Sequence, residues 1–198
     1  MADDTMHRIA TLFCAAFLLA SCGSQASAPP LAGASIGGPF TLTDQNGRSV
    51  SDRDFAGKYR IVYFGYTYCP DVCPTDVQNI GLGLKKLEKS DPTRAARVVP
   101  IFITVDPARD TPPVLEQFVS TFHPRLVGLT GSPEAIAKVA KEFAIFYQKQ
   151  DPSPGATGYL VNHSRIAYLM DPEGKPVAMV RADESGDAVA EDLKRWVQ

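Results

Sequence analysis

The chain is poor in cysteine and histidine and has no excess of basic charge. Its 198 residues include 4 Cys, 3 His and 1 Trp, and 20 Lys and Arg are balanced by 22 Asp and Glu. A net charge of -2 without a basic stripe does not provide the cationic surface that nucleic acids need, so we expect no nucleic-acid partner. The sequence also lacks internal repeats, and with 44% hydrophobic residues it predicts one globular domain.

The N-terminal apolar run is too short to span a membrane stably. It covers Ile9–Ala20 after the weakly basic pair His7-Arg8, and this pattern is typical of a secretory signal peptide. The run ends in Leu-Ala-Ser followed by Cys22, which resembles a bacterial lipobox. We therefore expect residues 1–21 to be a signal peptide of the lipoprotein type and Cys22 to be the lipidated residue. The alternative is an ordinary signal peptide with an incidental cysteine.

A tether follows the predicted lipid site. Residues 22–35 are rich in Ser, Ala, Pro and Gly, which predicts a flexible linker, and residues 36–198 form the predicted folded domain. A lipid anchor holds a protein firmly on a membrane when several acyl chains act together. We expect a lipid-anchored protein of the bacterial cell envelope that faces the periplasm or another extracytoplasmic space.

Only two cysteines belong to the predicted domain. Cys14 lies in the signal peptide and Cys22 is the lipid site, so Cys69 and Cys73 remain. In an oxidising compartment such a pair can form a disulfide. A disulfide that closes so short a loop stabilises a fold little, so redox or metal chemistry explains the pair better than a structural role.

The hydrophobic pattern alternates between strands and helices. Expected strands are 40–43 and 49–50, joined by the hairpin signal Asn46-Gly47, and then 59–66, 98–105, 126–129, 165–171 and 177–181. Expected helices are 74–89, a helix capped by Thr111, a helix capped by Ser132 whose apolar face runs from Ile136 to Phe146, and a last helix with Val189, Leu193 and Trp196. This order predicts an α/β fold with a central mixed sheet, helices on both faces and an N-terminal hairpin.

The spacing of the cysteine pair favours a metal over a disulfide without excluding either. Cys69 and Cys73 follow an apolar strand and precede a helix, and a helix N-terminus lowers thiol pKa values. In a helical turn the two β-carbons would be about 6 Å apart, which is long for a disulfide at about 3.8 Å. That spacing suits two sulfurs at about 2.3 Å from one metal ion. Pro70 and Pro74 limit how helical this turn can be.

A third ligand would complete a trigonal site for Cu(I) or zinc on two thiolates. The domain has two histidines, and either one can be merely structural. His123 ends a predicted helix, where a hydrogen-bonding role is natural. His163 lies in a loop just before the 165–171 strand, and functional groups of open α/β sheets gather at the carboxyl ends of strands. His163 is therefore the candidate ligand.

Asp106 ends a buried strand at the same edge of the sheet. Two roles stay open for it: an acceptor that orients His163 or a nearby donor, and a carboxylate that caps a turn or pairs with Arg109. Tyr66 and Tyr68 either shield a metal or pack in the core and rim. Asp71, inside the cysteine loop, is expected to face solvent.

Three motifs in order resemble the Sco/SenC family. They are Tyr63–Pro74, Thr104–Pro112, and Asn162–Ser164 with Tyr168–Gly174, and the similarity runs from about residue 40 to the C-terminus. The resemblance implies a thioredoxin-like fold in three layers and a membrane-anchored protein. It also implies one copper ion, as Cu(I) or Cu(II), bound by Cys69, Cys73 and His163.

The same resemblance implies a copper metallochaperone. It would deliver copper to the dinuclear copper centre of cytochrome c oxidase, with the copper-site subunit of the oxidase and a periplasmic copper donor as partners. The alternative is a thiol–disulfide reductase that keeps the oxidase cysteines reduced, with Cys69 and Cys73 as the redox pair and possible disulfide. A peroxiredoxin is disfavoured, because the resemblance would require the pattern Pro-Xaa-Xaa-Xaa-Thr-Xaa-Xaa-Cys. In this chain Thr67 lies two rather than three residues before Cys69. Whether the chain is an enzyme stays open.

Overall fold

The computed structural model describes residues 28–152 and 158–198. The predicted signal peptide, Cys14 and Cys22 lie outside these residues, as do residues 153–157. No helix within the described ranges is long and apolar enough to cross a membrane.

A seven-stranded mixed sheet forms the centre of the domain. Its strands lie in the order β2-β1-β5-β4-β3-β8-β9. Their bounds are β1 (Thr41–Asp44), β2 (Ser49–Ser51), β3 (Tyr59–Gly65), β4 (Val98–Thr104), β5 (Val127–Thr130), β8 (Ala167–Met170) and β9 (Pro176–Val180). The three middle strands β3, β4 and β5 are parallel, and the flanking pairs are antiparallel. Every residue of β3 is buried, as its unbroken apolar run predicts for a strand covered on both faces.

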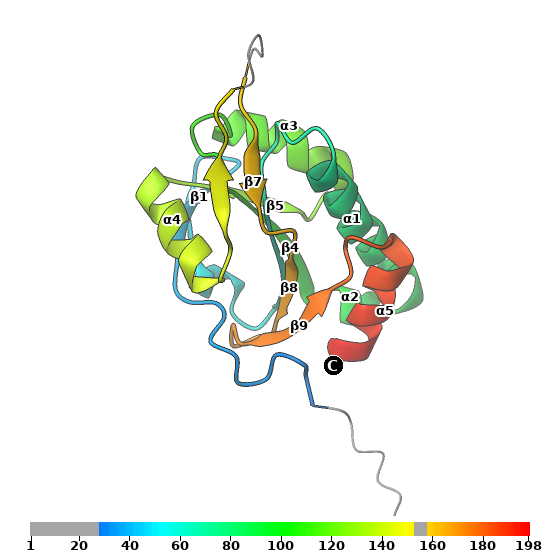
Figure 1. Cartoon of the computed structure of the whole chain (residues 1–198). Helices are drawn as coiled ribbons and strands as arrows, with labels where there is room; N and C mark the ends of the chain where they lie inside the picture. The colour runs from blue at the N-terminus through cyan, green and yellow to red at the C-terminus, as the bar shows by residue number, and fades with distance from the viewer. Residues whose placement is uncertain (1–27, 153–157) are drawn as a thin grey trace, which may run out of the picture.

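Helices cover both faces of this sheet (Figure 1). They are the 3-10 helix η1 (Asp52–Phe55) and the α-helices α1 (Val72–Ser90), α2 (Pro92–Ala95), α3 (Pro112–Phe122), α4 (Pro133–Glu142) and α5 (Gly186–Trp196). Helix α1 packs against α3 and α5 on one face, and α4 lies on the other. The predicted three-layer architecture, with its mixed sheet and N-terminal hairpin, is confirmed.

One helix ends earlier than predicted. The chain leaves α4 after Glu142 and turns at Ala144, which adopts a φ of 53°. Ile145 is then buried, whereas the side chain of Phe146 is 60% exposed. Placing Phe146 on the apolar face of this helix was therefore wrong, because the left-handed turn breaks the helical spacing.

A second, two-stranded sheet was not predicted from the sequence. It pairs β6 (Tyr147–Lys149) with β7 (Val161–His163) in antiparallel register, and His163 lies opposite Tyr147. His163 thus ends a strand, so the prediction that it lies in a loop was wrong. Strands of three residues are too short to show a periodic pattern, which is why this hairpin escaped prediction.

The described part of the predicted tether runs along the domain. The Leu31 N–H donates to the Val177 carbonyl at the outer strand β9, at 3.0 Å. A little further on, the Gly37 N–H donates to the Glu142 carbonyl at 2.8 Å. Residues 28–35, which the sequence assigned to the linker, therefore contact the domain at its edge.

Candidate metal centre

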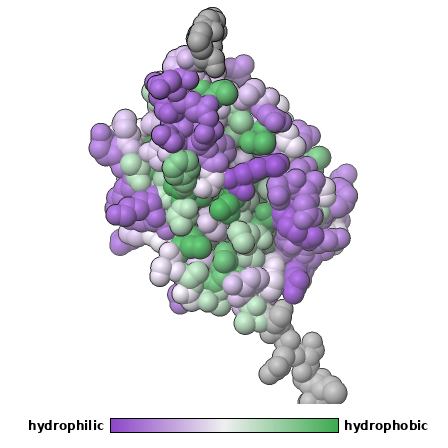
Figure 2. Space-filling model, in the orientation of Figure 1, coloured by the Kyte–Doolittle hydropathy of each residue, from purple (hydrophilic) through white to green (hydrophobic). Residues whose placement is uncertain are grey.

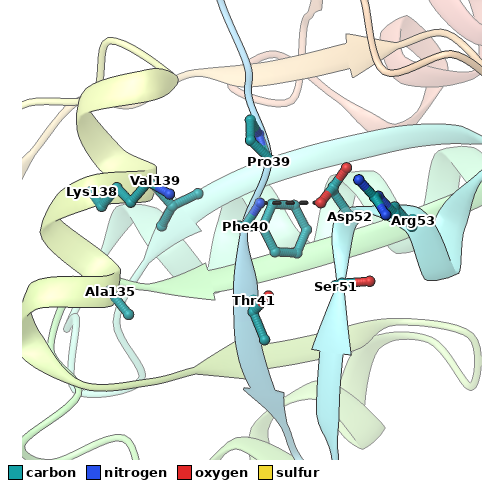
Figure 3. A pocket seen from close by; sticks show the side chains of 9 residues that line it. All are labelled: Pro39, Phe40, Thr41, Ser51, Asp52, Arg53, Ala135, Lys138 and Val139. Carbon is teal, nitrogen blue, oxygen red and sulfur yellow. Dashed lines mark hydrogen bonds between the residues drawn. The ribbon is translucent and has the colours of Figure 1, made fainter.

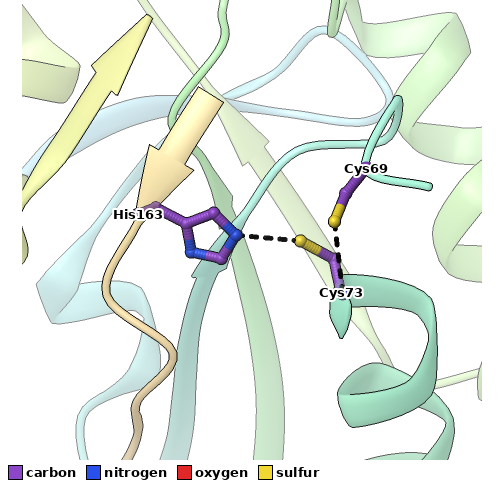
Figure 4. Close-up of side chains that lie close together, drawn as sticks. All are labelled: Cys69, Cys73 and His163. Atoms are coloured by element: carbon purple, nitrogen blue, oxygen red, sulfur yellow. Dashed lines mark hydrogen bonds between the residues drawn. The ribbon is translucent and has the colours of Figure 1, made fainter. Parts of the chain in front are cut away.

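Two sulfurs and one imidazole meet at the carboxyl end of β3. Cys69 lies in the loop between β3 and α1, Cys73 is the second residue of α1, and His163 ends β7 (Figure 4). Their ligand atoms lie within 4.8 Å of one another, and both cysteines are free thiols. The fold thus brings together the three residues that the sequence singled out from two distant segments.

The two cysteines have different surroundings. Cys73 is fully buried, and its Sγ lies 3.0 Å from Nε2 of His163. Cys69 is partly exposed, and its Sγ accepts the backbone N–H of Cys73 at 3.5 Å. This N–H belongs to the first turn of α1. The backbone N–H groups of a first helical turn have no acceptor within the helix, so they favour a negatively charged atom nearby.

Burial controls the protonation of the inner pair. It raises the pKa of the Cys73 thiol far above its ordinary value, and the neighbouring Cys69 adds to the rise. It also lowers the pKa of His163. Without a metal the pair is therefore a neutral thiol that donates its S–H to a neutral imidazole. The predicted lowering of the thiol pKa was wrong for Cys73, because desolvation outweighs the helix N-terminus there.

The imidazole of His163 is oriented by the backbone of the next residue, Ser164. Its Nδ1 lies 3.0 Å from the carbonyl oxygen of Ser164, so Nδ1–H donates and Nε2 keeps its lone pair for Cys73 or a metal. The rings of Tyr63 and Tyr66 stand edge-on to the imidazole, at interplanar angles of 87° and 89°. Tyr66 is buried and accepts the Val161 N–H at its hydroxyl, so it also braces the strand that carries His163.

Asp106 takes the role of an ion-pair partner. Its carboxylate accepts from Nε of Arg109 at 2.5 Å and from the hydroxyl of Tyr159 at 2.8 Å. Because Nδ1 of His163 is bonded to Ser164, Asp106 does not orient this imidazole. Of the two roles left open for Asp106, the pair with Arg109 describes the structure.

The remaining sequence candidates lie outside the cluster. His123 is buried behind α3, where its Nδ1 accepts the Arg125 N–H at 3.1 Å and its Nε2 lies 3.4 Å from Glu88. Asp71 faces solvent, as expected. Tyr68 is 52% exposed beside the guanidinium of Arg109, so it belongs to the rim.

Sequence reasoning missed Asp110, which holds the cysteine loop. This buried carboxylate accepts the backbone N–H of Thr67 at 3.0 Å and the hydroxyls of Thr67 and Thr104, each at 2.6 Å. It therefore ties the segment before Cys69 to the end of β4. Gly65 leaves room for Cys73, because a β-carbon at position 65 would lie only 3.1 Å from Sγ of Cys73.

A second buried carboxylate, Asp76, was also missed. It is 1% exposed on α1 and accepts from the hydroxyl of Tyr63 and from the guanidinium of Arg165. A signal was available, because Asp76 lies four residues before Ile80 on the apolar stripe of this helix, where a charge needs a partner.

Cavity size does not point to this site. A cavity of about 440 Å³ lies away from the cysteines, between α4 and the β1–β2 hairpin (Figure 3). There Asp52 accepts the Phe40 N–H at 3.2 Å, which closes the corner of the hairpin. Elsewhere, apolar residues gather over the middle of the face seen in Figure 2, between more hydrophilic margins. The functional assignment therefore rests on the chemistry of the cysteine–histidine cluster.

Comparison with known proteins decides the family. Residues 28–198 match the SCO1/SenC family profile. The chain belongs to the SCO1/SenC family. It is 43% identical over 162 residues to protein SenC of Rhodobacter capsulatus, which covers 82% of this chain and 71% of SenC. It is 38% identical over 170 residues to the mitochondrial SCO1 homolog 1 of Arabidopsis thaliana, covering 85% of this chain and 49% of that protein. The chain thus spans about half the length of that plant relative.

Solved structures of Sco proteins share the fold. Copper-bound ScoI of Bradyrhizobium japonicum superposes with a TM-score of 0.72 at 42% identity, covering 81% of this chain and 99% of that one. A Sco protein with a disulfide switch, from a family described as cytochrome c oxidase assembly proteins, has a TM-score of 0.62 at 25% identity, covering 84% and 94%. The thioredoxin domain of a Bacteroides vulgatus thiol-disulfide oxidoreductase has a TM-score of 0.56 at 20% identity, covering 83% and 96%. This last likeness concerns the fold alone and confirms the thioredoxin-like prediction.

Proposed function

We propose that this chain binds one copper ion through Cys69, Cys73 and His163 and delivers it to the dinuclear copper centre of cytochrome c oxidase. The observation that carries the proposal is the convergence of two sulfurs and one imidazole nitrogen within 4.8 Å. Thiolates select Cu(I), and imidazole suits Cu(II) as well. The copper-bound relatives and the description of the family as oxidase assembly proteins support this choice.

The dimensions of the cluster fit a single ion. With metal–ligand bonds of about 2.0–2.3 Å, ligand atoms lie at most about 4.6 Å apart. The ligand atoms of the cluster all lie within 4.8 Å of one another, close to this limit. The hydrogen bond from Nδ1 of His163 to Ser164 keeps Nε2 free to bind, as expected of a metal-ligating histidine.

Transfer follows from the unequal exposure of the ligands. Cys73 and His163 form the inner wall of the site, and the partly exposed Cys69 is on the side that a partner can reach. Three ligands leave one side of the ion open, where an acceptor thiolate can bind and replace the donors one at a time. The proton of Cys73 leaves when the ion enters and returns when the ion departs.

Copper titrations of single variants test the ligand set. We expect His163→Ala to keep Cu(I) on the two thiolates and to lose most Cu(II) binding, whereas Cys69→Ser and Cys73→Ser lose both. His123→Ala is the matched control, because that histidine lies outside the cluster. Cu(II) binding by His163→Ala that equals the wild type under anaerobic conditions would show the assignment to be wrong.

The second candidate function is a thiol–disulfide reductase of the oxidase cysteines. The free thiols, the thioredoxin-like fold and the disulfide switch of a relative favour it. Cys69 would attack the substrate disulfide, and Cys73 would then displace the substrate thiol. The Cys69–Cys73 disulfide forms as the substrate gains two electrons and two protons. Metal-free reduction of a copper-site peptide, lost on replacing either cysteine, distinguishes this activity from copper transfer.

We also propose that Cys22 carries a lipid that anchors the domain in the bacterial cell envelope, facing the periplasm or another extracytoplasmic space. The lipobox-like ending and the match to bacterial SenC support this location. Growth with radioactive palmitate should label the wild-type chain and leave Cys22→Ser unlabelled. Equal labelling of both would remove the anchor from the proposal without affecting the copper site.

A further inference from the structure

An ion pair between a buried carboxylate and a partly exposed guanidinium connects the helix that carries Cys73 to the segment that carries His163. Asp76 follows Cys73 by three residues on α1, and Arg165 follows His163 by two residues. The guanidinium binds the carboxylate with two hydrogen bonds, from Nε to Oδ2 at 2.7 Å and from Nη2 to Oδ1 at 2.5 Å. Such bidentate pairs fix orientation as well as distance.

The same carboxylate also binds the central sheet. The hydroxyl of Tyr63, in β3, donates to Oδ2 of Asp76 at 2.9 Å. The ring of Tyr63 in turn stands edge-on to the imidazole of His163, with centroids 6.4 Å apart. Asp76 therefore joins β3, α1 and the segment after β7 at one buried point.

Such a connection matters because His163 is not part of the main sheet. Its strand β7 pairs with β6 in a separate two-stranded sheet, and the chain joins the main sheet only at Ala167, which pairs with Tyr63. Within the described residues, the Arg165–Asp76 pair and the bond from the Val161 N–H to the Tyr66 hydroxyl span from this hairpin to the cysteine side. Of these two, the ion pair reaches the helix of Cys73, in addition to the contact between Cys73 and His163 itself.

We propose that the Asp76–Arg165 pair is a positioning device that holds Nε2 of His163 at bonding distance from Sγ of Cys73. The proposal rests on the metal site proposed above and adds what controls its third ligand. Neither residue touches the metal. Loss of the pair releases the imidazole while the two cysteines keep their places on the β3–α1 turn. The site then loses affinity for Cu(II), which depends on the imidazole nitrogen, and keeps its affinity for Cu(I), which the two thiolates bind.

Two variants are needed to separate positioning from folding. Asp76→Asn removes the charge, keeps an acceptor for Tyr63, and leaves Arg165, whose side chain is 38% exposed, accessible to water. The double variant Asp76→Asn/Arg165→Gln leaves no charge without a partner. Arg165→Lys keeps the charge without the two-point contact and should give an intermediate result.

The chain offers a matched control elsewhere. Arg181, directly after β9, binds Asp192 of α5 through Nε and Nη2, and the carboxylate side chain is 11% exposed. This pair also joins a strand end to a helix, but neither segment carries a ligand of the cluster. Asp192→Asn therefore removes a partly buried carboxylate partner of an arginine without touching the site, and Arg181 keeps its contacts with Glu184 and Glu191.

The experiment uses the full chain with Cu(II) alone and Cu(I) alone, each titrated anaerobically against a chelator. We expect Asp76→Asn and the double variant to lose at least about tenfold in Cu(II) affinity, with Cu(I) affinity unchanged within about threefold, and Asp192→Asn to change neither. A tenfold change corresponds to about 1.4 kcal/mol, well above titration error. Equal losses of both ions, no loss of Cu(II), or the same loss in Asp192→Asn would overturn the proposal.

A metal-free measurement separates this proposal from the copper function. In the apoprotein, the NMR cross-peak between the ring of His163 and the β-protons of Cys73 should be present in wild type and Asp192→Asn and absent in Asp76→Asn. Its persistence in Asp76→Asn would overturn the positioning role even if copper binding changes. If wild type binds no copper, the proposed function fails, and this cross-peak still decides whether the ion pair positions His163.

Discussion

The Sγ atom of Cys73 lies 3.0 Å from Nε2 of His163, although the two residues are 90 positions apart in the chain. One belongs to the first turn of α1 and the other to the last position of β7. Cys73 is buried and His163 is partly buried, and this burial raises the pKa of the thiol and lowers the pKa of the imidazole. The two residues therefore form a neutral thiol–imidazole pair that a metal ion can convert into two ligands.

The two cysteines should differ in reactivity. Cys73 is fully buried with a raised pKa, whereas Cys69 is partly exposed. Since the thiolate is the nucleophile, we expect iodoacetamide at pH 7 to alkylate Cys69 at least about tenfold faster than Cys73. Peptide mass spectrometry of the metal-free protein measures both rates. The difference should vanish in guanidinium, and equal rates in the folded protein would contradict the burial of Cys73.

Metal binding should release a proton from Cys73. A raised pKa means that this thiol is protonated at pH 7, so Cu(I) binding must displace at least one proton per ion. Titration in weakly buffered solution measures this release. The lowered pKa of His163 means that its imidazole is already neutral, so His163→Ala should release as many protons as the wild type. A smaller release by that variant would show that the imidazole was charged.

Replacing Asp110 should loosen the cysteine loop. Its carboxylate accepts three hydrogen bonds from Thr67 and Thr104 in a buried position, and the amide of Asn can accept at only one of its two ends. We expect Asp110→Asn to lower the free energy of unfolding by about 1–3 kcal/mol in urea. The control is Asp171→Asn, which accepts backbone N–H groups in an exposed turn and should cost less. An equal cost for both would argue against a special role for Asp110.

His123 should make the fold sensitive to mild acid. Desolvation lowers its pKa below the ordinary value of 6.5, so the unfolded chain binds this proton more readily than the folded one. Stability should therefore be complete above pH 6.5 and fall as the pH decreases through that value, by at most about 1.4 kcal/mol per pH unit for one group.

Comparison with His123→Asn isolates this contribution. The amide oxygen of Asn can replace Nδ1 as acceptor for the Arg125 N–H, and His163, whose pKa is also lowered, is retained in both proteins. Urea unfolding between pH 5 and 7.5 should show a weaker dependence on pH in the variant. Parallel curves for the two proteins would mean that His123 is not the titrating group.

Much of the fold could be predicted because it follows from local patterns. The apolar run of β3, the Asn46-Gly47 turn and the spacing along α1 each place side chains on one face of one element. The β6–β7 hairpin could not be predicted in this way, since its strands have three residues each. Its absence from the prediction also left His163 in a loop.

The sequence by itself determined the strands of the main sheet, the long helices, the cysteine spacing and the three motifs that place this chain in its family. Only the tertiary structure decided that His163 meets Cys73, that Asp106 pairs with Arg109, and that Asp76 and Asp110 support the site. The physical reason is range. Side-chain periodicity acts within a few residues, whereas these contacts depend on how separate strands and helices pack. Burial, which sets the pKa of Cys73, exists only after that packing is complete.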